Sequence, residues 1–346
     1  MASMAANAFN PAINMQPGCF SLVSIRSNSA VDRPTLSIII VHFNTPEITG
    51  ACVASLTNVL AQSQLDGRYE IVVLDNRSEI NNFQFLSENL SEIGNPKVKL
   101  VRNSLNAGFG LGCMLALNYS AGEFVAFVNS DTQFDEDCFL PLIDYLRAHP
   151  NVGVITPQHR NVDGSPHRSF GTFDTLTARL FGPRLAARLT AKSTTADVAP
   201  DQPRDIDFPF GSFMLFRLSV LAEVGGFDPN IFLFYEEMDV CLRMRKLGYS
   251  AVFYPGVGFR HIGQASLDKA VTTKQESDLS LLYVMRKNHS YPYYLAFFLL
   301  KFVSYMLKSI YSPKYRPLFR QLLTSGPPQA HSARTRQKCN YDYIND

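Results

Sequence analysis

The chain has 346 residues, of which 46% are hydrophobic, so it is long and apolar enough to fold around a large buried core. Its 32 basic and 30 acidic residues leave a net charge of +2, which gives no general electrostatic reason to expect nucleic acid as a partner. The six cysteines are scattered singly, without a CxxC pair or metal-ligand spacing, and this usage is typical of a reducing cytoplasm.

The first 34 residues contain a short apolar patch, "CFSLVSI", without the basic region that precedes the core of a secretion signal. We therefore expect residues 1–34 to be a disordered leader, or an over-long start, rather than a secretion signal.

Strands and helices alternate in the first half of the chain. The β-rich runs are "TLSIIIVHFN" (35–44), "YEIVVLDNRS" (69–78), "VKLVRN" (98–103) and "EFVAFVNSDTQF" (123–134), with helix-compatible segments between them. This alternation predicts an α/β fold with a mostly parallel sheet flanked by helices. Three of the runs end in polar residues, and the carboxyl ends of parallel strands are where ligands bind in such sheets. The sequence therefore predicts a polar ligand site at that edge.

Two features near this edge are candidates for contact with a nucleotide. Asp75 is placed to accept hydrogen bonds from a nucleobase or ribose, with a turn former or helix cap as an equal alternative. The segment "NAGFGLG" (106–112) lets the backbone approach a ligand closely, but it is neither a P-loop nor a G-x-G-x-x-G motif.

Asp131, in "VNSDT", is a candidate metal ligand. A carboxylate at a strand end can hold Mg²⁺ or Mn²⁺ together with a diphosphate, and the alternative is an aspartate that starts a turn or caps a helix. His261 ends the strand predicted at "SAVFYPGVGFRH" and is placed to complete the metal shell or to donate to a phosphate, although a single histidine is more often structural. The turn-rich stretch 158–209 is either a loop over the site or an ordinary surface insertion.

Three carboxylates crowd into "FLFYEEMDVCLRMRKLGY" (232–249), directly behind an aromatic run. A helix that begins here would place Glu236 and Glu237 at its positive end and let Asp239 pair with Arg243 four positions on. That arrangement leaves one carboxylate in surplus. In a partly apolar pocket beside like charge, it would gain proton affinity suited to a general base acting on a sugar hydroxyl.

The C-terminal part contains the apolar segment "YPYYLAFFLLKFVSYMLKSIY" (291–311), in which Lys301, Ser304 and Lys308 form one polar helix stripe. Two lysines in a broken apolar run favour a helix that lies in a membrane interface over one that spans the bilayer. Basic residues continue to Arg320, so we expect residues 291–320 to contact a membrane surface. Packing of this helix on the rest of the protein is the alternative.

Taken together, the motifs resemble those of glycosyltransferase family 2, with the GT-A fold, and within it the rhamnosyltransferase-like branch of bacterial polysaccharide assembly. The resemblance covers about residues 35–265 and rests on the ordered motifs "SIIIVHFN", "VVLDNRS", "RNSLNAGFG", "FVNSDT", "FGSFMLFRLSVLAEVGGFD", "FLFYEEMDVCLRMRKLGY" and "RH". It implies a catalytic domain over 35–265 and a helical, membrane-associating region over 266–346.

The resemblance also implies roles for individual residues. Those implied to bind the nucleotide sugar are Phe43, Asn44, Asp75, Asn106, Gly108 and Asp131. Asp131 and His261 match the metal-binding positions, and Glu237 matches the general base, with Glu236 and Asp239 as other claimants. The motifs depart from the family in two places, because "NSD" replaces a DxD-like sequence and "EE" replaces "ED".

The activity implied is inverting transfer of a sugar, with L-rhamnose from dTDP-rhamnose as the first expectation and other UDP-, GDP- or dTDP-sugars as alternatives. The acceptor would be a saccharide or lipid-linked saccharide at the cytoplasmic membrane face, and Mg²⁺ or Mn²⁺ the cofactor. Two other function classes stay open on the sequence alone: a dinucleotide-dependent oxidoreductase, and a sugar-nucleotide-binding protein without catalysis.

Overall fold

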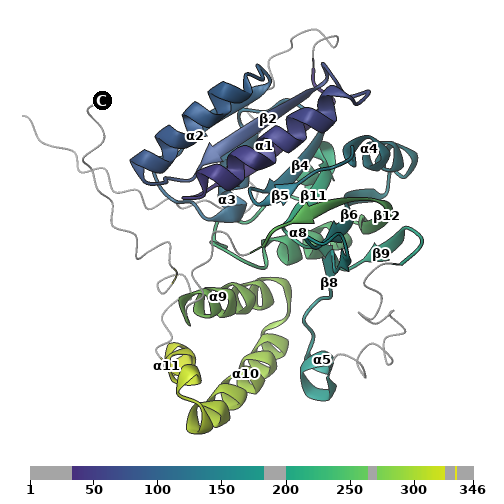
Figure 1. The fold of residues 1–346 in the computed structure, drawn as a ribbon. Coiled ribbons are helices and arrows are strands. Elements are labelled where there is room, and N and C mark those ends of the chain that lie inside the picture. The colour runs from purple at the N-terminus through teal and green to yellow at the C-terminus, as the bar shows by residue number, and fades with distance from the viewer. Residues whose placement is uncertain (1–32, 183–199, 264–270, 324–331, 333–346) are drawn as a thin grey trace, which may run out of the picture.

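The computed structural model describes residues 33–182, 200–263, 271–323 and 332 (Figure 1). Residues 1–32 of the predicted leader and residues 183–199 of the predicted 158–209 excursion therefore lie outside the described residues.

A ten-stranded sheet forms the centre of the protein (Figure 1). The main strands lie in the order β3-β2-β1-β4-β11-β6-β12-β5, with β7 paired to β6 and β9 paired to β12. Neighbours among β1 to β4 are parallel, as are β6 and β12, whereas β11 runs antiparallel between β4 and β6. The strands are β1 Leu36–His42, β2 Tyr69–Asp75, β3 Val98–Arg102, β4 Phe124–Asn129, β5 Thr132–Gln133, β6 Val152–Arg160, β7 Pro166–His167, β9 Arg204–Ile206, β11 Phe213–Arg217 and β12 Ser250–His261, and β8 Phe170–Gly171 pairs separately with β10 Phe208–Pro209.

Helices cover both faces of this sheet. They are α1 Pro46–Ala61, α2 Ile80–Ile93, α3 Phe109–Leu117, α4 Phe139–Ala148, α5 Leu176–Phe181, α7 Leu218–Glu223, α8 Glu236–Lys246, α9 Val271–Asn288, α10 Tyr291–Tyr311 and α11 Arg316–Leu323. In β1, Ile38 and Ile40 pack in one core cluster with α1, α2 and α4, and Ile39 packs in the other with α3 and α8. Because successive side chains of a strand point to opposite faces, a run of isoleucines is what a doubly covered strand requires. The predicted α/β fold with its mostly parallel sheet is confirmed.

The last three helices, α9 to α11, stand below the sheet in Figure 1. On α10 the side that faces the protein carries Phe297, Lys301 and Tyr305, which are all buried. The Nζ atom of Lys301 lies 2.7 Å from Oδ1 of Asp278 on α9, and the Tyr305 hydroxyl donates to Oδ2 of the same carboxylate at 2.6 Å. The expected polar stripe is therefore corrected for Lys301, which points inward because a buried carboxylate is available there to pair with it.

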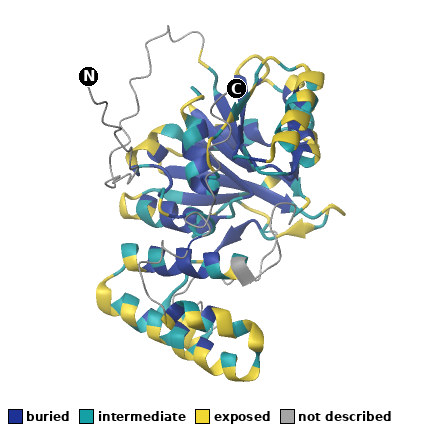
Figure 2. Ribbon diagram, turned by 90° about the vertical axis from the view of Figure 1, so that its left-hand side faces the viewer, coloured by how far each residue is buried: buried dark blue, intermediate teal, exposed yellow. Residues whose placement is uncertain are grey.

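The outward side of α10 is apolar. Figure 2, coloured by burial, shows that much of this helix is exposed. Its exposed residues include Leu295, Leu299, Val303, Met306, Leu307 and Ile310, and we call this set the apolar face of α10. Among the described residues, α10 is the one helix long and apolar enough to cross a membrane by length and composition, and only 17% of its most apolar stretch is buried. Length and composition of a single helix are weak evidence for a membrane span.

Candidate active site

The ends of β1, β2 and β4 bring the predicted site residues to one edge of the sheet. In the parallel register His42 is opposite Asp75, and Val41 is opposite Asn129. The residues that follow these strands, including Asn44 and Asp131, are consequently carried to the same edge, as parallel strands require.

Asp75 is completely buried at this edge. Its Oδ1 accepts a hydrogen bond from the Ser78 amide at 3.1 Å, and Nε of Arg102 lies 3.4 Å from Oδ2. Oδ2 itself has no hydrogen-bond partner within the described part of the chain, and burial raises the pKa of the carboxyl. Asp75 therefore holds the turn after β2, and a nucleotide would reach its carboxylate only after neighbouring side chains shift.

Asn44 ties the end of β1 to the start of α2. Its side-chain oxygen accepts from the Glu79 amide at 2.8 Å and from Nδ2 of Asn82 at 3.1 Å. Its backbone has a φ of 55°, a left-handed conformation that asparagine adopts more readily than most residues. Phe43, just before it, is half-buried.

The predicted donor loop, residues 106–108, is held by Asn76, a residue that the sequence reading missed. The Asn76 side-chain oxygen accepts from the Ala107 amide at 2.8 Å, and its Nδ2 donates to Asn106 Oδ1 and to the Gly108 carbonyl, both at 2.9 Å. Its place next to Asp75 in the "LDN" motif was the signal that could have identified it.

Gly108 is required by the path of this loop. It has a φ of +78°, and a Cβ atom there would lie 1.9 Å from the Phe232 carbonyl oxygen. The same carbonyl accepts a hydrogen bond from the Phe109 amide at 3.0 Å. The glycine thus lets the donor loop pack against the aromatic run that leads into α8.

Asp131 and His261 lie together, as predicted. Nε2 of His261 is 2.9 Å from Oδ1 of Asp131, although 130 residues separate the two in the sequence. Both side chains are mostly buried, with 9% and 17% of their surfaces exposed. The pairing of β12 with the short strand β5 places them, because His261 is opposite Thr132 in that register.

The donor atoms of this pair fit a divalent cation only in part. One carboxylate oxygen and one imidazole nitrogen are ligands that Mn²⁺ accepts, and the carboxylate also suits Mg²⁺. Among the described residues there is no group of three or more histidine, cysteine or acidic side chains arranged to hold a metal. A cation bound here would therefore complete its shell with diphosphate oxygens and water.

Glu236 and Glu237 begin α8, as predicted, and follow two residues in a strained conformation. Phe234 and Tyr235 have φ values of 68° and 67°, which bulky side chains rarely adopt and which recur at functional sites. Neither Oε2 atom of the two glutamates has a hydrogen-bond partner in the described ranges, and both atoms are buried.

The environment of the two glutamates makes them hold protons. Burial raises the pKa of Glu237 to about 7. For Glu236, burial and then the neighbouring charge of Glu237 raise the pKa well above its usual range. The two carboxyls therefore bind a proton more readily than free glutamates, and of the two Glu237 loses its proton at the lower pH.

The Asp239 carboxylate has hydrogen-bond donors, whereas the Oε2 atoms of Glu236 and Glu237 have none among the described residues. Its carboxylate is fully buried and is bound by Nε of Arg243 at 2.9 Å, Nζ of Lys287 at 2.8 Å and Nδ2 of Asn288 at 2.8 Å. The predicted Asp239–Arg243 pair is confirmed, and three donors occupy the carboxylate. We therefore assign Asp239 to holding α8 against α9.

Comparison with known proteins decides the family. The model of the family described as glycosyl transferase family 2 matches residues 37–225, more than half of the chain. The chain belongs to glycosyl transferase family 2. The match contains β1 to β4, Asp75 and Asp131, and ends before α8.

Within family 2 the chain is rhamnosyltransferase-like. It is 25% identical over 181 residues to N-acetylglucosaminyl-diphospho-decaprenol L-rhamnosyltransferase of Mycobacterium tuberculosis, covering 48% of this chain and 59% of the relative. It is 24% identical over 160 residues to rhamnosyltransferase WbbL of Escherichia coli, covering 43% and 58% respectively. The chain thus spans a little under three fifths of the length of these two relatives.

A solved structure shares the fold. The mannosyltransferase PcManGT from Pyrobaculum calidifontis, solved with GDP-Man and Mn²⁺, superposes with a TM-score of 0.50 at 16% identity, covering 86% of this chain and 78% of that one. The resemblance to the GT-A fold is confirmed.

Proposed function

We propose that this family 2 protein is an inverting glycosyltransferase that moves a sugar from a nucleoside diphosphate to a hydroxyl of a saccharide or lipid-linked saccharide. The observation that carries the proposal is the Glu237 carboxylate at the start of α8, whose Oε2 atom is buried without a hydrogen-bond donor among the described residues. This environment raises its pKa to about 7, which suits a general base at neutral pH.

The chemistry is a direct displacement. The acceptor hydroxyl gives its proton to the carboxylate of Glu237, and the hydroxyl oxygen forms a bond to the anomeric carbon. The bond from that carbon to the diphosphate oxygen breaks, and the nucleoside diphosphate leaves with the electron pair. Attack from the face opposite the leaving group inverts the anomeric centre without a covalent sugar–enzyme intermediate. Because burial and the charge of Glu237 raise the pKa of Glu236 well above its usual range, Glu237 is the carboxylate proposed to accept the proton of the acceptor hydroxyl.

Asp131 and His261 would hold Mg²⁺ or Mn²⁺ with the donor diphosphate. When bound, the cation neutralises the charge that develops on the leaving diphosphate. The rest of the donor lies against the turns after β1 and β2, at Phe43, Asn44 and Asp75, and against the loop at Asn106 and Gly108. Among donors we favour dTDP-rhamnose, because two relatives of this chain are named rhamnosyltransferases.

Residues 35–265 would form the catalytic domain, and residues 266–346 a helical region that meets the cytoplasmic face of a membrane. The apolar face of α10 supports this arrangement, since it is exposed and is followed by the exposed Lys314, Arg316 and Arg320. Apolar side chains beside basic ones are typical of helices that lie in the headgroup region of anionic bilayers.

Turnover with a panel of donors tests the proposal. The full chain is incubated with dTDP-rhamnose, a UDP-sugar or a GDP-sugar, with octyl N-acetyl-β-glucosaminide as the acceptor and with Mg²⁺ or Mn²⁺, and nucleoside diphosphate release is measured. One donor should be consumed, and its nucleoside diphosphate should raise the melting temperature more with the cation than without. Stabilisation by NAD alone, without release from any donor, would contradict the proposal.

Vesicle flotation tests the membrane contact separately. The full chain should float with vesicles that contain anionic lipid, and replacement of Leu299 and Val303 by aspartate should abolish flotation while leaving donor turnover in detergent intact. Ser304→Asp, which adds a charge on the same helix outside the apolar face, is the matched control. Equal flotation of all three proteins would refute the contact.

A further inference from the structure

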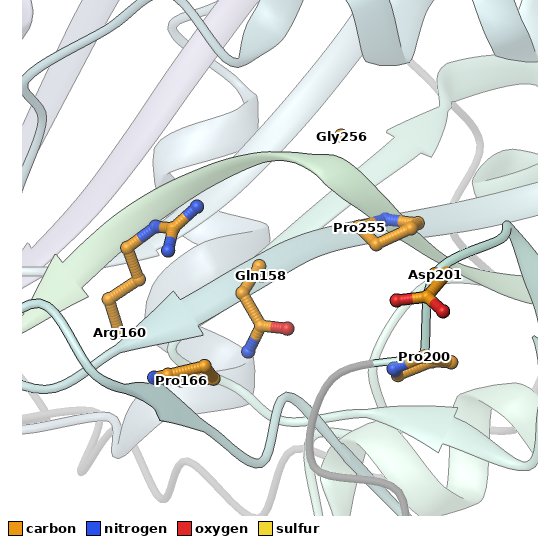
Figure 3. A pocket seen from close by; sticks show the side chains of 7 residues that line it. All are labelled: Gln158, Arg160, Pro166, Pro200, Asp201, Pro255 and Gly256. Atoms are coloured by element: carbon orange, nitrogen blue, oxygen red, sulfur yellow. The ribbon is translucent and has the colours of Figure 1, made fainter.

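A pocket opens between β6, β12 and the start of the segment that leads to β9 (Figure 3). Its lining residues are Gln158, Arg160, Pro166, Pro200, Asp201, Pro255 and Gly256. The pairing of β12 with β6 shifts register between Tyr254 and Gly258, so that Pro255 and Gly256 belong to a bulge. Bulges of this kind recur next to binding sites because they redirect a strand locally.

Gln158, in the middle of the pocket, carries an unused hydrogen-bond acceptor. The side chain is almost completely buried, at 3% exposure. Its Nε2 donates to two backbone carbonyls, those of His159 at 2.7 Å and His167 at 2.6 Å. Two carbonyl partners fix the orientation of the amide, because a flipped amide would place its oxygen against these two carbonyl oxygens, which cannot donate a hydrogen bond.

The oxygen of Gln158 has no such partner. Within the described residues Oε1 is buried and without a hydrogen bond, and Figure 3 shows it turned toward the side of Pro255 and Asp201. A buried acceptor without a donor costs free energy, on the order of 1–3 kcal/mol. A ligand that donates a hydrogen bond here would recover that energy.

The lining contains one basic and one acidic residue, and this pair of charges indicates whether a ligand of the pocket is an anion, a cation or neutral. Arg160 stands at one end of the pocket and Asp201 at the other (Figure 3). An anion such as phosphate would meet the Asp201 carboxylate and the acceptor on Gln158, and a cation would meet Arg160. A neutral group with several hydroxyls satisfies all three, because each hydroxyl both donates and accepts.

The Arg160 end of the pocket and the proposed metal-binding pair lie at the same end of β6 and β12. β6 and β12 run parallel, and Arg160 is opposite Arg260, the residue before His261. Arg160 thus ends β6 at the strand edge that carries the Asp131–His261 pair. Its side chain is on the sheet face opposite to that of His159, whose ring lies 5.1 Å from the His261 ring.

We propose that this pocket binds a neutral sugar unit of the acceptor, held by the Gln158 oxygen, Arg160 and Asp201. The inference rests on the proposed transferase function and adds a subsite for the acceptor. The proline rings of Pro166, Pro200 and Pro255 give the sugar an apolar wall.

Binding of simple glycosides tests the subsite. The full chain, with the donor site filled by nucleoside diphosphate and Mn²⁺, is titrated with the methyl glycosides of rhamnose, mannose, glucose and N-acetylglucosamine, and saturation-transfer NMR measures binding. At least one glycoside should bind, and Arg160→Met and Asp201→Asn should each weaken it roughly tenfold. Gln158→Leu should do the same, and the first two variants keep the test decisive if the loss of its two backbone contacts prevents folding.

Controls separate this inference from the proposed function. Arg147→Met removes an exposed arginine of α4 and should leave glycoside binding unchanged. In all variants the release of nucleoside diphosphate by donor hydrolysis should stay within about twofold of the wild type. Absence of glycoside binding, equal binding in the variants, or competition by inorganic phosphate would overturn the subsite even if donor turnover is normal. Absence of turnover in the wild type would instead overturn the transferase function.

Discussion

The Asp131–His261 pair and the Glu236–Glu237 pair are both carboxylate sites, and they differ in how the carboxylates are satisfied. Asp131 has an imidazole nitrogen 2.9 Å away, whereas the Oε2 atoms of the two glutamates are buried without partners. A carboxylate with a nearby donor is poised to hold its charge and share it with a cation, and one deprived of donors is poised to take up a proton. In the proposed mechanism, the Asp131–His261 pair is the metal and leaving-group side of the reaction, and the Glu236–Glu237 pair is the acceptor side.

Glu237→Gln breaks the acceptor side and should have the largest effect. Loss of the general base is expected to lower kcat by roughly 10²–10⁴-fold. Nucleoside diphosphate affinity, measured by calorimetry, should change by less than about threefold, since the base lies outside the proposed donor contacts. Arg147→Met serves as the neutral control, and near-normal kcat in Glu237→Gln would show that another group takes the proton.

Asp131→Asn should disrupt the proposed metal site at the Asp131–His261 pair. Asparagine keeps the shape but loses the charge that would hold the cation, so kcat/KM is expected to fall by about 10²-fold. The thermal stabilisation that Mn²⁺ adds to nucleoside diphosphate binding should disappear with it, and this second readout does not depend on activity. If Mn²⁺ still enhances nucleotide binding in the variant, Asp131 is not a metal ligand.

Lys287→Met tests what holds the Glu236–Glu237 side in place. Lys287 of α9 lies 2.7 Å from Asp228 and 2.8 Å from Asp239, which comes two residues after Glu237. Its removal leaves two buried carboxylates short of a cation and should destabilise the fold by about 2 kcal/mol, measured by urea unfolding. Because α8 loses part of its anchor, kcat should also fall while the donor KM is retained.

Lys246→Met is the matched control for this variant. Lys246 belongs to α8, and its hydrogen-bond partner in the described part of the chain is Asn288 at an exposed position, with Nζ 3.2 Å from the Asn288 side-chain oxygen. Its loss should cost less than about 0.5 kcal/mol. Equal destabilisation by both variants would remove the special role of Lys287.

A smaller effect concerns stability against pH. The pKa of Glu237 is raised by burial from 4.5 to about 7, so the folded protein binds the proton more tightly than the unfolded chain. The resulting stability is fully present below pH 4.5 and is lost as the pH rises through about 7. Glu237→Gln, which cannot ionise, should therefore be more stable than the wild type at pH 8, by on the order of 1–3 kcal/mol. Parallel stability curves for the two proteins between pH 5 and 8 would contradict the buried position of Glu237.

The same comparison shows what local patterns can predict. The strand ends, the start of α8 and the Asp239–Arg243 pair follow from hydrophobic runs and short spacings. The meeting of Asp131 and His261 could be expected only because Asp131 follows β4 and His261 ends β12, and both strands end at one edge. Contacts set by tertiary packing could not be read from the sequence: Asn76 reaches across to the donor loop, Asp75 is sealed by Arg102, and Lys301 turns inward to Asp278. Each depends on which elements become neighbours in space.

The most direct test of the central claim, that Glu237 is the general base, is the pH dependence of kcat for the wild type between pH 5 and 9 with donor and acceptor saturating. The account predicts that kcat rises with pH along a single ionisation near pH 7, because only the deprotonated carboxylate accepts the proton from the acceptor hydroxyl. A kcat that stays constant from pH 5 to 9 would contradict it, because Glu237 would then not titrate in the reacting complex.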